Sequence, residues 1–339
     1  MLIRMFSVLL IGFVFLGNTP KDETPAALAP YIVDGELRTD DFGWMRGAFD
    51  GATEQQKAEW QSLTNWVQTC GVADHKAMIA ELAAMGVTTE LKESGMSGST
   101  ACASVQPFQL LAKQTRNWDE FIASEAKGRE VFRIYQYGAR AAAKNMPYEK
   151  MWGNEDAWTL MGAAIQEQVF RLGFSWEADD KAPKLDPAIM PYLQAHLSNA
   201  VRHEDHANTD MLKKLVAEKG WPAISKVGPQ AANNAWLLVQ HADHDPVFQL
   251  KALRLMEPLV ATREVSKRNY AYLYDRIMLK LVGKQRFGTQ FMGCADGEYK
   301  LRPLENEQQL DKLRADNELE PIAEYRNSMK TAFGPCISK

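Results

Sequence analysis

The sequence lacks an excess of charge of either sign, with 39 Lys and Arg residues against 43 Asp and Glu residues and a formal net charge of −4. A surface that neutralises nucleic-acid phosphates needs a basic excess. We therefore expect no nucleic-acid partner. Apolar residues make up 46% of the chain, which is too many for a disordered protein and enough to bury a full core.

Several catalytic and cofactor motifs are also missing. The sequence has no Gly-x-Gly-x-x-Gly and no P-loop, so a dinucleotide or nucleotide fold is not indicated. It has no Gly-x-Ser-x-Gly elbow of the kind that serine hydrolases use. It has no Cys-x-x-Cys, so neither a zinc knuckle nor a thioredoxin-like redox pair is predicted.

Long apolar runs are absent except at the N-terminus, where Arg4 precedes a largely apolar run over residues 5–16. A basic residue before about a dozen apolar residues is typical of a signal peptide, and the run is too short to span a membrane. No Ala-x-Ala follows it, so cleavage near residue 17 and retention as an anchor both stay open. We predict an exported, periplasmic protein whose membrane contact is limited to an uncleaved N-terminal segment.

The chain contains four cysteines, an even number that favours disulfide bonds in an oxidising compartment. Four cysteines allow three connectivities. Pairing the neighbours along the chain places one disulfide in each half. We therefore predict the pairs Cys70–Cys102 and Cys294–Cys336.

Apolar residues recur at helical spacing along most of the chain, which predicts a mainly α fold. Thr53-Glu-Gln-Gln56 has the form of a capping box, and Asp245-Pro246 is typical of a helix start. In residues 276–291, two short apolar runs around Gly283-Lys284 instead favour a small antiparallel β-hairpin. Helices are expected over about 54–69, after Asp74, and over about 117–145, 155–172, 188–218, 229–244, 246–263, 266–274, 306–316 and 321–331, with a loop at about 86–106.

Two shifts in composition suggest how the chain is divided. Residues 18–40 are rich in Pro, Asp, Glu and Thr, and residues 177–187 combine acidic residues with two prolines. We expect a signal peptide or anchor at 1–17, a linker at 18–40 and a helical N-terminal domain at 41–176. A second linker at 177–187 would lead to a C-terminal helical module with the β-hairpin at 188–339, which makes an α+β unit.

A series of short motifs runs in one order through the C-terminal part. Its members are Asp205-x-x-Asn208, Gly220-Trp-Pro222, Val227-Gly228, Gln240-His-Ala-Asp243, Phe248-Gln249, Ala271-Tyr-Leu273, Asp275-Arg276, Gln285 and Gly288-Thr-Gln290, followed by Arg314 and Tyr325. Each motif is weak alone, but the ordered series is specific. Over about residues 200–330 the chain resembles the bacterial domain-of-unknown-function family 6624. The resemblance implies no activity, and the N-terminal part resembles no known family.

The polar residues of this series stand at predicted junctions between elements, where they could converge on one pocket. His241 lies at a helix C-terminus, which favours the imidazolium form and suits a general acid or base. Asp243 and Asp275 could orient it, and Arg276 could hold an anionic group. Gln240, Gln285, Thr289 and Gln290 would then position a substrate by hydrogen bonds. A purely structural Asp–Arg–Gln network is an equally good interpretation of the same residues.

Histidines form a second pattern, because five of the six lie between residues 196 and 244. His203 and His206 are three residues apart, as are His241 and His244, and residues at this spacing share a helix face. Two such helices could bind zinc or copper. Only His241 belongs to the family series, however, so no metal or other cofactor is favoured.

The sequence leaves two functions open. The first is a periplasmic hydrolase or transferase with a His/Asp/Arg/Gln site for an anionic small molecule. The second is a non-catalytic cell-envelope protein that binds a partner, in which the polar cluster is structural. Whether the protein is an enzyme is not decided by the sequence.

Overall fold

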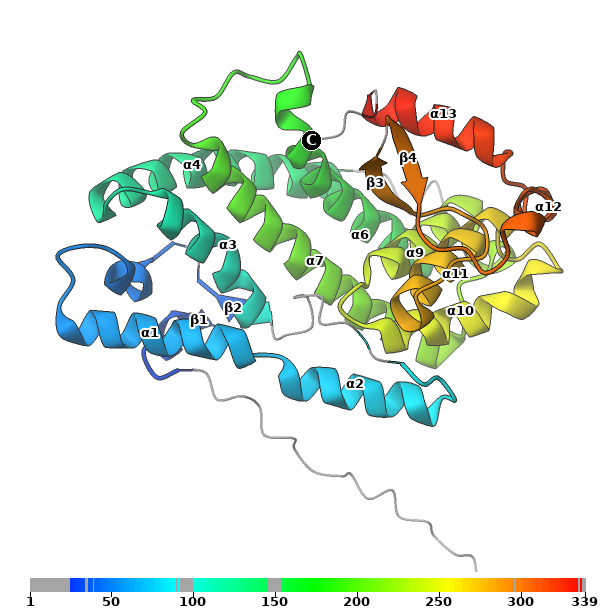
Figure 1. Cartoon of the computed structure of the whole chain (residues 1–339), viewed down its shortest axis with the longest axis horizontal. Coiled ribbons are helices and arrows are strands. Elements are labelled where there is room, and N and C mark those ends of the chain that lie inside the picture. Colours follow the sequence, from blue (N-terminus) through cyan, green and yellow to red (C-terminus); the bar gives the residue numbers. More distant parts are fainter. Residues whose placement is uncertain are drawn as a thin grey trace, which may run out of the picture.

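The computed structural model describes residues 25–33, 36–38, 40–89, 91, 100–145, 154–295, 297–334 and 336. The predicted signal segment at 1–17 lies outside the described residues. The chain is mainly helical and carries a small two-stranded antiparallel sheet near its C-terminus, as predicted. Figure 1 shows the helices of the first half on one side and the C-terminal helices with the sheet on the other.

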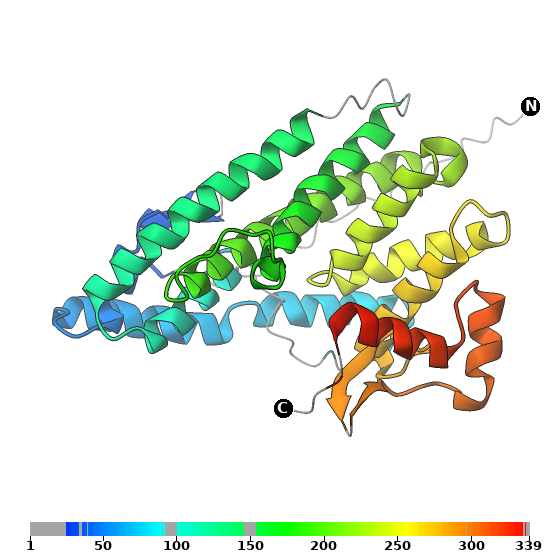
Figure 2. The ribbon, with the colours of Figure 1, turned by 90° about the horizontal axis from the view of Figure 1, so that it is seen from above.

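The helices of the first half begin at residues that satisfy free backbone N–H groups. Thr53 and Gln56 form the predicted capping box, and Asn117 and Asn154 each accept a hydrogen bond from the third residue of the helix that follows. The helices are η2 (Gly43–Ala48), α1 (Glu54–Thr69), α2 (Val72–Ala84), α3 (Thr100–Gln114), α4 (Trp118–Lys144) and α6 (Glu155–Leu172). α1 and α2 follow one another along one side of the molecule (Figures 1 and 2).

One prediction for this half is wrong. The loop predicted over about 86–106 ends before Thr100, where α3 begins. Cys102, Val105 and Phe108 follow at helical spacing and are buried, so packing and the nearby disulfide favour the helix over the turn propensity of the Ser and Thr residues. The linker at 18–40 stays a prediction; within it β1 (Ile32–Val33) pairs with β2 (Glu36–Leu37), and Leu28 and Leu37 are buried.

The second half begins with a long helix, and shorter helices follow it. The long α7 (Met190–Lys219) is followed by α8 (Ile224–Val227), α9 (Pro229–His241), α10 (Pro246–Val260) and α11 (Lys267–Val282). Asp245 caps α10 through Phe248 N–H, as its position before Pro246 predicts. After the sheet the chain forms the 3₁₀ turn η4 (Glu307–Gln309) and the helices α12 (Leu310–Asp316) and α13 (Ile322–Phe333).

The largest hydrophobic core joins both halves of the chain. It combines Leu160 and Ala164 of α6 with Leu238 of α9, Met256 of α10 and Ile277 of α11. A 3₁₀ segment, η3 (Gly173–Ala178), and a turn connect α6 to α7 across the predicted boundary at 177–187. The division into two domains stays a prediction. Because α6 packs against α7 and α9, side chains from both sides of this boundary meet in one place.

The β-hairpin is present, but not at the predicted residues. Residues 276–282 continue α11, because Tyr274, Ile277 and Leu281 keep the helical spacing of buried positions. Gly283, at a φ of 75°, ends the helix in a left-handed conformation that favours glycine. The hairpin forms later, between β3 (Phe291–Ala295) and β4 (Glu298–Leu301).

Two disulfides join the predicted cysteines. Cys70–Cys102 connects the end of α1 to α3, with its Cα atoms 6.2 Å apart. Cys294–Cys336 ties β3 to the C-terminal segment, with a Cα separation of 5.3 Å. Among the described residues, no helix is both long and apolar enough to cross a membrane.

Candidate functional site

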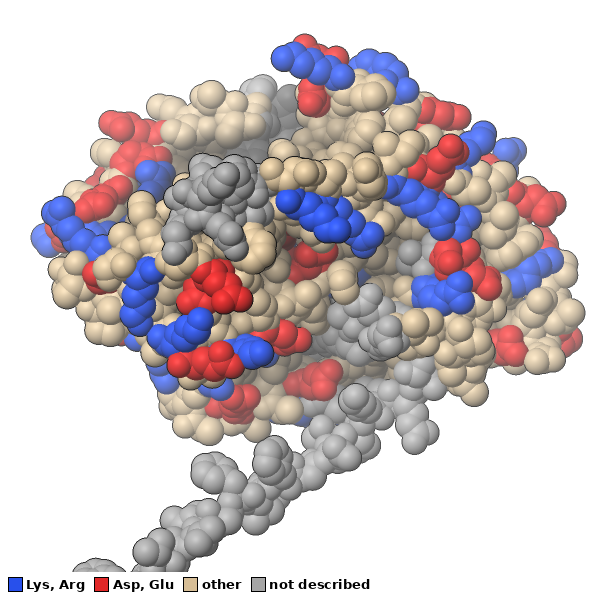
Figure 3. Space-filling model, turned by 180° about the vertical axis from the view of Figure 1, so that it is seen from behind, with Lys and Arg blue, Asp and Glu red and all other residues tan. Residues whose placement is uncertain are grey.

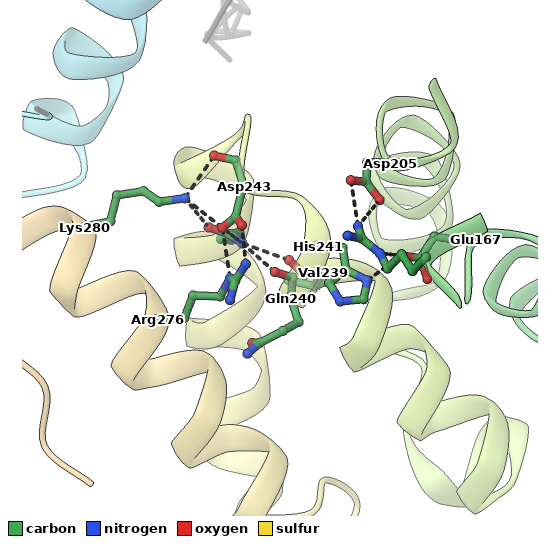
Figure 4. Close-up of polar contacts among 10 residues, drawn as sticks. Glu167, Asp205, Val239, Gln240, His241, Asp243, Arg276 and Lys280 are labelled. Atoms are coloured by element: carbon green, nitrogen blue, oxygen red, sulfur yellow. Dashed lines mark hydrogen bonds and ion pairs between the residues drawn. The ribbon is translucent and has the colours of Figure 1, made fainter. Parts of the chain in front are cut away.

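The candidate site lies where α9 ends. His241 is the last residue of α9, and the turn after it leads directly into α10. The imidazole Nδ1 of His241 lies 2.7 Å from Oε1 of Glu167 on α6, and Figure 4 shows the two side chains directed toward one another. The contact has the distance of an ion pair but not the angles of a hydrogen bond.

Glu167 is a carboxylate with an exposed fraction of 0% and several partners. It accepts hydrogen bonds from Nε of Arg171 and Nε2 of Gln168. Burial raises the pKa of Glu167, but the contacts with His241 and Arg171 outweigh burial and lower the pKa below its usual value. Glu167 is therefore ionised near neutral pH and favours the tautomer of His241 with the proton on Nδ1.

Arg171 connects Glu167 to a second carboxylate. Its Nη2 donates to both oxygens of Asp205 on α7, at 2.7 and 2.8 Å. Burial raises the pKa of Asp205 to about 7, against the opposing effect of Arg171 and with the help of the charges on Glu167 and Asp243. Asp205 can therefore exchange a proton near neutral pH.

Asp243, in the turn after α9, is bound by two cations of α11. Arg276 donates to it from Nε at 2.9 Å and from Nη2, and Lys280 donates to its carboxylate and to its backbone oxygen, both at 2.9 Å (Figure 4). Arg276 and Lys280 are four residues apart and share one face of α11. Burial raises the pKa of Asp243, but the two cations hold it well below its usual range. These contacts fix the turn that follows His241.

Of these side chains, those of Arg171, Asp205, His241, Asp243 and Arg276 line one cavity of about 240 Å³, here called the histidine cavity. Within it, the imidazoles of His206 and His244 stack with ring centroids 3.7 Å apart. Burial lowers the pKa of both rings, that of His244 to about 3, so both are neutral near pH 7. The lining residues are Arg171, Phe174, Ser198, Val201, Arg202, Asp205, His206, His241, Asp243, His244 and Arg276.

The predicted site residues divide between this cavity and the protein interior. His241, Asp243 and Arg276 line the cavity. Asp275, with an exposed fraction of 0%, does not, because its carboxylate accepts hydrogen bonds from the loop after α11. The donors are the backbone N–H groups of Arg286, Phe287 and Thr289 and the hydroxyl of Thr289, at 2.7 to 3.0 Å. Burial raises the pKa of Asp275 although these donors oppose it.

The three predicted glutamines have different positions. Gln285 is fully buried, and its side chain bonds to the backbone of Gln290 and Arg302. Gln240 is buried, and its Oε1 has no partner among the described residues. Gln290 lines a second hollow beside the sheet. Asp275 and Arg276, expected at a junction between a helix and a strand, therefore lie inside α11. Of the predicted site residues, only His241, Asp243 and Arg276 converge on the histidine cavity.

Four residues of the site were not predicted as catalytic or substrate-binding: Glu167, Arg171, Asp205 and Lys280. For Glu167 and Arg171, the sequence did contain one signal. Leu160, Ala164 and Glu167 recur at helical spacing, so a carboxylate stands in an apolar stripe of α6, followed by a cation four residues later. Asp205 belongs to the motif series. Nothing local in the sequence shows that α6 packs beside the end of α9.

The histidines form a different set from the one that their spacing suggests. His206 of α7 meets His244, but His203 is not among the residues that line the cavity. Among the residues that the structure describes, one group has ligand atoms close enough for a metal ion, namely Glu167, Asp205 and His241, whose atoms lie within 4.8 Å of one another. Arg171 already binds both carboxylates of this group. A metal ion would have to displace that guanidinium, so the geometry does not favour zinc or copper there.

Comparisons with known proteins found a match to a family model, over residues 188–338. Neither a curated protein nor a solved structure matches the chain. The matched region includes α7, the turn with His241 and Asp243, and α11, whereas Glu167 and Arg171 lie before it. No family model matches the N-terminal part. Residues 188–338, the C-terminal part of the chain, match the model of a family of unknown function (DUF6624), as the motif series predicts.

Proposed function

We propose that the protein is a hydrolase or transferase that acts on an anionic substrate in the histidine cavity. The observation that carries this proposal is the position of His241. Its Nδ1 lies against the buried carboxylate of Glu167, while its ring lines the cavity. A histidine oriented by a carboxylate at an open cavity is the arrangement of a general base.

The chemistry assigns a separate role to each group. Glu167 holds Nδ1 of His241, so that Nε2 accepts a proton from water or from an acceptor hydroxyl. The deprotonated oxygen attacks the electrophilic carbon or phosphorus of the substrate, and the bond to the leaving group breaks. The leaving group takes its proton from Asp205, whose pKa of about 7 leaves a protonated fraction near neutral pH. Asp205 then recovers that proton from the imidazolium through solvent.

An anionic substrate suits the remaining charges of the cavity. Arg171, Arg202 and Arg276 line it, against the two carboxylates Asp205 and Asp243. A guanidinium group donates in a planar fork that matches carboxylate and phosphate oxygens. The face of the molecule in Figure 3 shows Lys and Arg intermingled with Asp and Glu, which favours a small ligand over a polyanion on that face.

The proposed location is an oxidising compartment outside the cytoplasm. Both predicted cysteine pairs form disulfides, and disulfides are rare in cytosolic proteins. The N-terminal signal pattern supports the same location.

A replacement of His241 tests the catalytic role. His241→Gln removes the proton acceptor but keeps a polar side chain, so we expect the free energy of unfolding in urea to change by about 1 kcal/mol or less. The variant should fail to complement a deletion strain. His75→Gln on α2 is the matched control, and it should complement fully.

A second candidate function is a non-catalytic envelope protein. It is favoured by the fact that Arg171 and Arg276 are each already bonded to a carboxylate, as in a structural network. Full complementation by a folded His241→Gln variant would support it and refute the catalytic proposal. Unfolding of His241→Gln would place the residue among the structural groups.

A further inference from the structure

A larger groove adjoins the histidine cavity. Its volume is about 910 Å³, and Asp243 and Arg276 line both spaces. We call it the hairpin groove, because β3 and the segment after β4 form part of its wall. Its lining residues are Thr88, Thr89, Asp243, Arg276, Leu279, Lys280, Leu281, Val282, Gly283, Gln290, Met292, Arg302 and Pro303.

The charges of this groove are unequal. Among the described residues that line it, Arg276, Lys280 and Arg302 are basic and Asp243 alone is acidic. Arg276 and Lys280 share Asp243 as their carboxylate partner. Arg302 is exposed, and its guanidinium has no side-chain partner within the described part of the chain. One acid thus balances one of three cations, and the groove keeps a positive charge.

Neutral donors and apolar side chains complete the lining. The amide of Gln290 and the hydroxyl of Thr89 lie in the groove, and this hydroxyl is buried with no partner among the described residues. Met292 and Val282 line it as well, with exposed fractions of 62% and 48%. Arginine, amide and hydroxyl donors together are suited to an oxyanion, and the exposed apolar side chains are suited to a hydrocarbon portion.

We infer that the hairpin groove binds an oxyanion, a phosphate or carboxylate group, carried by a molecule with an apolar portion, and that Arg302 is its main charged contact. The inference rests on the proposed function only where it identifies this molecule as the substrate. An oxyanion at Arg302 would direct the rest of the molecule past the Asp243–Arg276 pair toward His241. The Asp243–Arg276 pair lines both spaces and so connects the hairpin groove to the histidine cavity.

Calorimetric titration of the whole protein tests the inference, with inorganic phosphate, butyl phosphate, acetate and pentanoate as probes. We expect saturable binding of one oxyanion class, which assigns the phosphate or carboxylate source. The longer probe of that class should bind about fivefold more tightly or better, because its alkyl chain is removed from water. Arg302→Gln should weaken binding by about tenfold, the loss of one charged, forked contact. Arg302→Lys, which keeps the charge without the fork, should lose less.

Lys300→Gln is the matched control. It removes one positive charge from β4, but Lys300 is not among the groove residues, so its binding should change by less than about twofold. Equal losses in the Arg302 and Lys300 variants would reduce the effect to general attraction and overturn the inference. No saturable binding of any probe, or no gain from the alkyl chain, would also overturn it. His241→Gln should bind the probes as the native protein does, so a failed groove and a failed catalytic proposal give different results.

Discussion

Asp275 and Arg276 are neighbours on α11 but belong to two polar clusters of opposite character. Asp275 is fully buried and binds the loop of residues 286–289 through its carboxylate. Arg276 keeps 30% of its side chain exposed and lines both the histidine cavity and the hairpin groove. Adjacent residues project about 100° apart around a helix, so one can serve the interior while the other faces solvent.

The comparison separates polar groups that build the fold from groups that are available for chemistry. The buried cluster continues through Arg314, which donates to the backbone oxygens of Phe287 and Glu320. Its polar atoms bond mainly to backbone groups of the same loop. The cavity cluster consists instead of side chains that bond mainly to side chains of other helices or of the turn after α9, with solvent beside them. The kind of partner and access to a cavity therefore distinguish the two, whereas residue type does not.

The largest expected effect comes from removing the centre of the buried cluster. Asp275→Ala leaves several buried N–H groups and the Thr289 hydroxyl without an acceptor, and each unsatisfied donor costs about 1–3 kcal/mol. We expect a loss of about 3 kcal/mol or more in the free energy of unfolding, measured in urea. Asp275→Asn keeps one acceptor oxygen and should lose less.

Arg276→Ala is the cavity counterpart of that experiment. It removes a partly exposed side chain and leaves Lys280 bound to Asp243, so its loss of stability should be smaller than that of Asp275→Ala. Equal losses for the two alanine variants would show that both clusters are structural, and the distinction between them would fail.

Acid should act on the cavity cluster through its stacked histidines. The folded-state pKa of His244 is lowered to about 3, against about 6.5 when unfolded, so the unfolded state binds the extra proton. Its contribution to stability is complete above the unfolded pKa and is lost as the pH falls toward 3. Between pH 6.5 and 5 the loss is about 2 kcal/mol.

Asp205, whose pKa is raised to about 7, gains stability over the same pH range, so the native protein alone does not report the loss at His244. Urea unfolding of the native protein and of His244→Gln at both pH values isolates it, because the two proteins should differ in pH dependence by that amount. His75→Gln on α2 retains both stacked rings and should behave like the native protein. If His244→Gln keeps the full pH dependence, the acid sensitivity arises elsewhere in the molecule, and the stacked pair is not what distinguishes the cavity at low pH.

Local signals in the sequence predicted most helices and their starts, because capping and helical spacing are short-range properties. Thr53, Asn117 and Asp245 cap the helices that they were expected to begin or to precede. The hairpin was misplaced because a short apolar run such as residues 276–282 fits a strand or a buried helix equally well. Packing of Ile277 and Leu281 against the core decides that choice, and packing is not local.

The site was predictable only in part, for a related reason. His241, Asp243 and Arg276 belong to recognisable motifs and do converge on one cavity. Glu167 is 74 residues from His241 along the chain, so their contact depends on how α6 meets the end of α9. Motifs also do not show which polar residues turn inward, so Asp275 and Thr289 resembled Arg276 until their burial was known.

The smallest expected effect concerns Gln290, which the sequence groups with Gln285. Gln285→Ala should cost about 2 kcal/mol or more, because its buried amide bonds to the backbone of Gln290 and Arg302. Gln290→Ala removes a groove-lining amide whose one side-chain bond, within the described residues, is to the Thr289 hydroxyl, and it should cost about 0.5 kcal/mol or less. Urea unfolding of both variants compares two glutamines of the same motif series. A loss at Gln290 as large as that at Gln285 would assign Gln290 to the buried cluster and remove it from the groove that is expected to hold a ligand.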